Sequence, residues 1–223
     1  FTTVDGWTIQ GTLYNGTGKN ILLLHGLGDH RAAWTEFARV LKQNGYTVLA
    51  IDLRGHGKST MADGVNKTWD DFTNADFAGM PKDASAAQQF LGNENISIIG
   101  ASIGANIALN YAAQSGKVPS LVLLSPGLNY KDITTESAMR LYEGAVFLAA
   151  GEIDSYSADS ASRLYDLASG KRELKIYNTG NHGTQLLKDQ AIQDTILAWL
   201  AKNYPAARPV SNSTNVTVAR RRI

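Results

Sequence analysis

The sequence predicts an α/β protein built on a doubly wound, mostly parallel sheet with helices on both faces. Continuous apolar runs such as residues 21–24 are typical of strands buried on both sides. Strands alternate with helical segments six times along the chain, a pattern typical of parallel sheets joined by right-handed crossovers. Loops containing Gly, His, Asp and Ser follow these strands, and such loops meet at the carboxyl edge of the sheet.

The composition indicates a globular protein and excludes several classes. The chain has 223 residues, 43% hydrophobic and 18% charged, which predicts one domain over about 1–204. A net charge of +1 gives no indication of nucleic-acid binding. The absence of cysteine excludes disulfides, thiol chemistry and Cys-ligated zinc, and no apolar run reaches the length of a membrane span.

The expected strands are short apolar runs bounded by turn residues. They cover 21–24, 46–51, 96–99, 121–124, 145–150 and 173–177. The expected helices show helical spacing of apolar residues. They cover about 33–43, 78–91 (broken or started by Pro81), 103–113, 160–168 and 185–202.

The remaining segments carry weaker signals. Residues 1–14 predict an antiparallel hairpin, because Asp5-Gly6 is a strong two-residue turn signal. Residues 61–73 are polar and predict a surface loop. Residues 205–223 predict a flexible tail, and the alternative is an added edge strand over 215–219. The chain begins with Phe1, so we expect a trimmed N-terminus, from a removed signal peptide or a cloning boundary; the sequence does not choose between a cytoplasmic and an exported protein.

Gly100-Ala101-Ser102-Ile103-Gly104 is the central motif and matches G-x-S-x-G between a predicted strand and a predicted helix. A sharp strand-to-helix turn exposes the serine hydroxyl and requires small residues at Gly100 and Gly104. The helix that follows directs free N–H groups at a developing oxyanion. The alternative is a glycine-rich turn with a serine helix cap.

With this motif placed on a doubly wound sheet, the chain resembles the α/β-hydrolase family over about 7–204. The motifs occur in the order of the family. They are His25-Gly26-Leu27-Gly28, the segment 52–59, the serine motif, the loop 151–154 and Asn181-His182-Gly183. The family order of catalytic residues is serine, acid, histidine, and this chain offers Ser102, Asp154 and His182 in that order.

The resemblance implies a catalytic role for each of the three residues. Ser102 would be the nucleophile, and His182 the general base that takes its proton and later protonates the leaving group. Asp154 would orient His182 and stabilise the imidazolium. Glu152 and Asp159 lie nearby and compete for the same role.

The resemblance also implies an oxyanion hole made by the backbone N–H groups of Leu27 and Ile103, with Gly26 allowing the first loop to turn tightly. It implies structural hydrogen-bonding roles for His25 and His56. His30 is expected at the surface near the site entrance, where contact with substrate is the alternative.

A zinc-dependent hydrolase is an alternative that the sequence disfavours. Residues 25–30 are similar to the H-x-H-x-D-H zinc motif of metallo-β-lactamase-like hydrolases, but Leu27 stands where the middle histidine belongs and cannot bind metal. We therefore expect neither a metal nor a cofactor.

The expected function is hydrolysis of short-chain carboxylic esters through an acyl-enzyme intermediate. The family often carries a lid after the fourth predicted strand, and here residues 126–143 leave room only for a minimal cap, which predicts an open site.

Ser102 stands where dienelactone hydrolases have Cys and where haloalkane dehalogenases and epoxide hydrolases have Asp. The expected partner is a small ester, and the oligomeric state stays open. The alternatives are another acyl hydrolase or transferase, such as a thioesterase, and a non-catalytic ligand-binding protein of the same fold.

Overall fold

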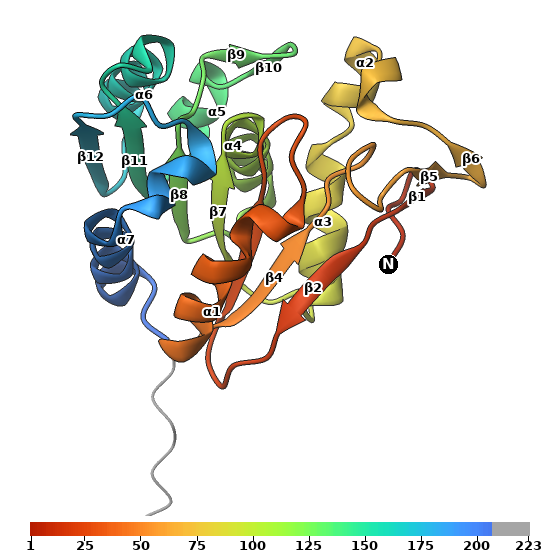
Figure 1. Ribbon diagram of the computed structural model, residues 1–223, viewed down its shortest axis with the longest axis horizontal. Helices are drawn as coiled ribbons and strands as arrows, with labels where there is room; N and C mark the ends of the chain where they lie inside the picture. Colours follow the sequence, from red (N-terminus) through yellow and green to blue (C-terminus); the bar gives the residue numbers. More distant parts are fainter. Residues whose placement is uncertain (207–223) are drawn as a thin grey trace, which may run out of the picture.

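A seven-stranded sheet forms the centre of the protein in the computed structural model, which describes residues 1–206 (Figure 1). The sheet has the strand order β12-β11-β8-β7-β3-β4-β2. The strand bounds are β2 Gly11–Tyr14, β3 Asn20–Leu24, β4 Thr47–Ile51, β7 Ser97–Ala101, β8 Ser120–Leu124, β11 Ala145–Gly151 and β12 Arg172–Tyr177. The predicted tail and its alternative strand over 215–219 lie outside the described residues, apart from 205–206.

Six of these strands are parallel to their neighbours, and only β2 runs antiparallel, pairing with β4 at one edge. Successive residues of a strand face opposite sides of the sheet. Leu22 and Leu24 therefore join one apolar core, whereas Ile21 and Leu23 join the other. The predicted doubly wound α/β fold is confirmed.

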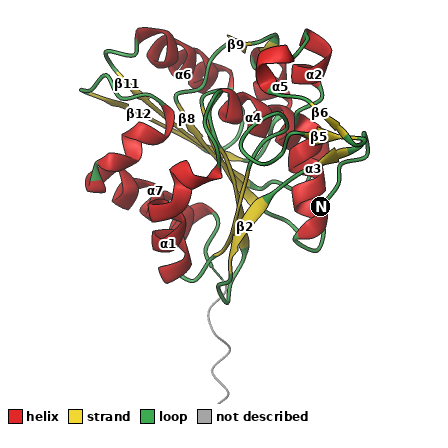
Figure 2. Ribbon diagram, turned by 45° about the vertical axis from the view of Figure 1, so that its right-hand side comes forward, coloured by secondary structure: helices red, strands yellow, loops and turns green. Residues whose placement is uncertain are grey.

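Helices cover both faces of the sheet (Figure 2). Helices α1 and α7 pack on one face, and α3 to α6 pack on the other. Their bounds are α1 Thr35–Gln43, α2 Asn74–Ala78, α3 Pro81–Phe90, α4 Ile103–Ser115, α5 Glu136–Leu141, α6 Ser155–Leu167 and α7 Gln190–Asn203, with short 3₁₀ helices η1 Arg31–Trp34, η2 Trp69–Asp71 and η3 Gly183–Lys188. Within residues 1–206, no helix combines the length and apolarity needed to cross a membrane.

The N-terminal antiparallel hairpin is present but shorter than expected. The chain turns at Asp5-Gly6, and Thr2 pairs with Thr8. Strand β2, the expected second strand of this hairpin, pairs with β4 instead and forms one edge of the main sheet. Strand β1 (Trp7–Thr8) pairs with β5 (Met61–Ala62), which pairs with β6 (Val65–Asn66).

Other boundaries also differ from the sequence prediction. The expected helix 185–202 is divided at Asp189 into the 3₁₀ helix η3 and the helix α7, which begins at Gln190. The expected loop 61–73 contains β5, β6 and η2. Each of these elements has too few residues to produce a hydrophobic periodicity in the sequence. Pro81 starts α3, which is one of the two outcomes expected for the helix 78–91, and Ala78 ends the separate helix α2. Helix α6 begins at Ser155, five residues earlier than predicted, since small polar residues in its first turns hide the apolar periodicity.

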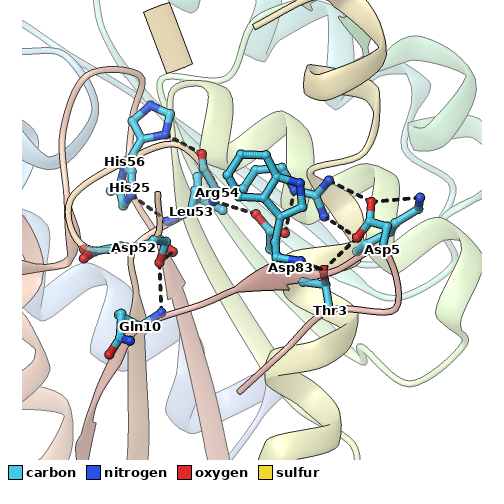
Figure 3. Close-up of polar contacts among 12 residues, drawn as sticks. Thr3, Asp5, Gln10, His25, Asp52, Leu53, Arg54, His56 and Asp83 are labelled. Carbon is cyan, nitrogen blue, oxygen red and sulfur yellow. Dashed lines mark hydrogen bonds and ion pairs between the residues drawn. The ribbon is translucent and has the colours of Figure 1, made fainter. Parts of the chain in front are cut away.

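Arg54 joins three separate segments of the chain through two carboxylates (Figure 3). Its Nε donates to Asp83 in α3 at 2.8 Å, and its backbone N–H donates to the same carboxylate at 2.8 Å. Its two terminal nitrogens donate to Asp5 in the N-terminal turn at 2.9 and 3.0 Å. Arg54 and Asp83 are both buried, so each charge depends on the other for compensation. Burial opposes the charged form of Arg54, but the two carboxylates outweigh it and raise the pKa.

Replacing Arg54 by Met is expected to lower the free energy of unfolding by about 3–5 kcal/mol, because Asp83 would stay buried without its partner. Urea unfolding of the two proteins measures the difference. The double variant Arg54→Met/Asp83→Leu removes the unpaired charge as well and should regain most of the loss. A double variant that is less stable than Arg54→Met would contradict this account.

Candidate active site

Ser102 lies at the sharp turn between β7 and α4, at the carboxyl edge of the sheet. Its backbone has φ 55° and ψ −126°, a region that residues other than glycine rarely adopt. Its N–H donates to the carbonyl of Leu124 on the neighbouring strand β8 at 2.8 Å. The strained conformation is therefore held by a hydrogen bond to the sheet, and Ser102 remains partly exposed.

The expected crowding at the two glycines of the motif is present. A Cβ atom on Gly104 would lie 2.4 Å from the carbonyl oxygen of Leu24 and 2.5 Å from that of His25. A Cβ atom on Gly100 would lie 2.4 Å from the carbonyl oxygen of Gly104. Because these neighbours are backbone atoms, no side-chain rotation relieves the contact.

His182 and Asp154 approach each other from two different loops. Asp154 follows β11 and precedes α6, and His182 follows β12. The distance between His182 Nδ1 and Asp154 Oδ2 is 2.6 Å. Asp154 is thus the acid that contacts the histidine, and the competing acids Glu152 and Asp159 are exposed.

The loop that carries His182 is bound to the sheet through Ser125, the first residue after β8. The backbone N–H of Gly183 donates to the hydroxyl of Ser125 at 2.9 Å. Ser125 is buried, has a φ of 48°, and donates its own N–H to Ala149 on β11 at 2.7 Å. This arrangement fixes the backbone directly after the histidine.

Leu27 and Ile103 bring two backbone N–H groups to the same edge. Within residues 1–206, neither N–H donates a hydrogen bond to another residue. The loop of Leu27 comes close to the nucleophile, since a Cβ atom on Gly26 would lie 3.3 Å from Ser102 Cβ. Two free donors beside a serine are suited to binding an anionic oxygen.

A cavity of about 250 Å³ opens beside these groups. Leu27, Ser102 and His182 line it together with Gly26, Asp29, Ala101, Gly183, Thr184 and Gln185. A larger hollow of about 390 Å³ between α3 and α4 contains none of the predicted site residues. Ser102, His182 and Leu27 thus share one small, partly polar cavity, whereas Asp154 and Ile103 are not among its lining residues.

The geometry agrees with structural roles for His25 and His56 (Figure 3). His25 Nε2 accepts the N–H of Leu53 at 3.0 Å, and burial lowers the pKa of His25 to about 3. His56 Nδ1 bonds the carbonyl of Arg54 at 2.8 Å, and burial lowers its pKa as well. Both rings are therefore neutral at physiological pH.

His30 is exposed, with Nδ1 3.6 Å from Asp29. Among residues 1–206, no group of three or more His, Asp or Glu side chains gathers as a metal site.

Three polar residues of this region were missing from the sequence analysis: Ser125, Tyr130 and Ser157. Ser157 in α6 places its hydroxyl 3.4 Å from His182 Nδ1, and Tyr130 places its hydroxyl 3.2 Å from that of Ser157. Serine and tyrosine are common residues with no local pattern here. Only their positions relative to distant loops make them part of the site.

Comparison of this chain with known protein families and proteins agrees with the fold described above. The family model for the alpha/beta hydrolase fold matches residues 19–143, more than half of the chain. An uncharacterized protein of Mycobacterium tuberculosis, Rv2715, is 34% identical over 134 residues, which are 60% of this chain and 36% of that protein. The chain thus matches only about a third of the length of this curated relative.

Two solved esterases have the same fold. The esterase EaEST from Exiguobacterium antarcticum superposes with a TM-score of 0.72 at 17% identity, covering 89% of this chain and 97% of its own. The Pyrococcus furiosus esterase Pf2001 superposes with a TM-score of 0.73 at 20% identity, covering 90% of each chain. At this identity the likeness establishes the architecture alone.

Gly104→Ala is expected to lower the free energy of unfolding by about 1–3 kcal/mol, because the new methyl group forces the start of α4 away from the end of β3. The better helix propensity of alanine acts in the opposite direction. Urea unfolding measures the net effect.

Gly180→Ala is the matched control, since its Cβ would contact only Ile153, at 3.7 Å. We expect it to change the free energy of unfolding by less than about 1 kcal/mol. A Gly104→Ala protein as stable as this control would contradict the crowding argument.

Proposed function

This chain belongs to the alpha/beta hydrolase fold family, and on this premise we propose that it is a serine hydrolase that cleaves short-chain carboxylic esters. The observation that carries the proposal is that a strained, accessible Ser102 shares one cavity with His182, whose Nδ1 lies 2.6 Å from Asp154. A buried structural serine would need neither the strain nor the adjacent histidine.

Acylation begins with His182, which takes the proton of the Ser102 hydroxyl as the oxygen attacks the ester carbonyl. Asp154 binds Nδ1 of the ring, so that Nε2 is the nitrogen that faces the reaction, and it stabilises the imidazolium that forms. His182 then transfers the proton to the leaving alcohol. A water molecule repeats the same steps on the acyl-enzyme and releases the acid.

The N–H groups of Leu27 and Ile103 bind the oxyanion of each tetrahedral intermediate. They come from two elements, the loop after β3 and the first turn of α4, which the contact at Gly104 holds together. Donors fixed in advance do not have to reorganise during the reaction, which is the reason such sites accelerate acyl transfer.

The size of the cavity supports short substrates. About 250 Å³ is at the small end of ligand pockets. The segment after β8 adds only β9 (Asn129–Tyr130), β10 (Ile133–Thr134) and the six-residue helix α5. This insertion provides no large apolar lid of the kind that would cover a long acyl chain.

Ser102→Ala is expected to lower kcat/KM for p-nitrophenyl acetate by at least about a thousandfold, because the nucleophile is lost while the fold is kept. Release of p-nitrophenol measures the rate, and a fluorophosphonate probe measures whether Ser102 is activated. Ser162→Ala serves as the control, since its exposed hydroxyl bonds only a carbonyl of its own helix. A protein that binds esters without an activated serine would neither hydrolyse p-nitrophenyl acetate nor react with the probe, and this result would overturn the proposal.

Across p-nitrophenyl esters from acetate to palmitate, we expect the highest kcat/KM at acetate to butyrate and a fall of about tenfold or more by octanoate, because the longer chain leaves the cavity. The same series with Ser102→Ala corrects for spontaneous hydrolysis. An optimum at a long chain would keep the mechanism and contradict the argument from cavity size.

A further inference from the structure

Tyr130 belongs to a short hairpin beside the proposed site. It ends β9 and pairs directly with Ile133 at the start of β10. The two residues between them, Lys131 and Asp132, have φ values of 52° and 63°, as the twist of a two-residue hairpin requires. This tight turn determines which side of the hairpin carries the tyrosine ring.

Side chains of α4 and the hairpin hold its backbone in place. The buried amide of Asn106 donates to the carbonyl of Ile133 at 2.8 Å and accepts the N–H of Gly127 at 3.1 Å. The hydroxyl of Thr135 donates to the carbonyl of Gly127 at 2.8 Å. The backbone around Tyr130 is therefore fixed on one side by α4.

Tyr156 of α6 fixes the other side. Its hydroxyl accepts the N–H of Asn129 and donates to the carbonyl of Asn129, both at 2.9 Å. Its ring packs edge-on against the ring of Tyr130, with centroids 5.6 Å apart. The hairpin thus bridges α4 and α6 above the end of β8.

This anchoring directs the ring of Tyr130 at the proposed catalytic groups. The ring packs on Gly127, where a Cβ atom would lie 2.6 Å from it. It meets the ring of His182 nearly at a right angle, at 87°, with centroids 6.5 Å apart. Its hydroxyl lies 3.2 Å from Ser157, whose hydroxyl lies 3.4 Å from His182 Nδ1. No step of the proposed mechanism uses this phenol.

The hydroxyl of Tyr130 can donate a hydrogen bond only while it is protonated. Burial raises the pKa of Tyr130, and the hydroxyls of Ser157 and Ser102 act against that rise. Tyr130 therefore stays protonated at neutral pH and has one O–H to donate. Tyr130 is not among the residues that line the cavity of about 250 Å³, so this donor lies beside that cavity, next to His182.

The position relative to His182 indicates which ester oxygen the phenol meets. In the tetrahedral intermediate the oxyanion points to the N–H groups of Leu27 and Ile103, and the leaving oxygen must face His182 to be protonated. Tyr130 packs against His182 from the side of β8, whereas Leu27 comes from β3 on the other side of β7.

We propose that Tyr130 is a catalytic residue whose O–H donates a hydrogen bond to the leaving-group oxygen of the ester. The inference rests on the proposed serine hydrolase function. His182 delivers the proton taken from Ser102 to that oxygen as the carbon–oxygen bond breaks, and Tyr130 keeps its own proton. The hydrogen bond stabilises the negative charge that develops on the leaving oxygen before proton transfer is complete.

The test compares wild type and Tyr130→Phe on acetate esters of p-nitrophenol, phenol and ethanol, which are progressively poorer leaving groups. The measured quantity is kcat/KM, because it reports the steps up to acylation. We expect a loss of about threefold for the p-nitrophenyl ester, rising to about thirtyfold for the ethyl ester, since a poorer leaving group depends more on the donor.

Tyr156→Phe is the matched control, because it removes a neighbouring phenol of α6 that bonds the same hairpin and leaves the Tyr130 hydroxyl in place. We expect any loss to be equal across the three esters. Titration with a fluorophosphonate counts the active sites of each variant, and a thermal melt shows that each is folded, so a partly folded variant does not imitate a kinetic effect.

The outcomes separate this inference from the function on which it rests. If wild type turns over with Ser102-dependent kinetics and Tyr130→Phe loses activity equally on all three esters, or loses none, Tyr130 makes no contact with the leaving oxygen. If wild type shows no Ser102-dependent turnover of any ester, the proposed function fails and this inference fails with it.

Discussion

The close contact between the first turn of α4 and the end of β3 is the constraint on which the site depends. The Gly104 Cα lies against the carbonyl groups of Leu24 and His25, where not even a methyl group fits. This contact brings the loop after β3 beside the nucleophile. It also forces the chain at Ser102 into its strained turn, because β7 must pass into α4 without moving away from β3. The proposed oxyanion donors are adjacent to one another for the same reason.

The loops at the carboxyl edge are held by polar groups that do not take part in the proposed chemistry. His25 and His56 are buried, neutral and bonded to backbone: His25 joins the loop after β3 to the loop after β4, and His56 bonds Arg54 within the second loop. Ser125 holds the loop after β12 in the same manner. His182 differs from the two buried histidines in its exposure of 42% and its carboxylate partner Asp154. Burial therefore separates the histidines that support the structure from the one suited to proton transfer.

The small insertion after β8 connects the architecture to the choice of substrate. The fold by itself accommodates many reactions, so selectivity has to arise from the residues around the nucleophile. Here the insertion is pinned to α4 and α6 and places one aromatic ring, that of Tyr130, beside the proposed catalytic histidine. A small rigid insertion of this kind leaves the proposed site without a large lid, and the polar groups of that site come from residues far apart in the sequence.

The sequence by itself determined the sheet, the serine turn and the order of the proposed catalytic residues, because each depends on a local signal: apolar runs, glycines beside Ser102, and a polar loop after each strand. The sequence did not predict the pairing of β1 with β5 or the hairpin of Tyr130, since those strands have two residues each and no periodicity. Only the tertiary structure decided that Asp154 contacts His182 while Glu152 and Asp159 face solvent. That choice depends on where α6 begins and how two loops meet across the sheet, and contacts between distant segments leave no pattern within either one.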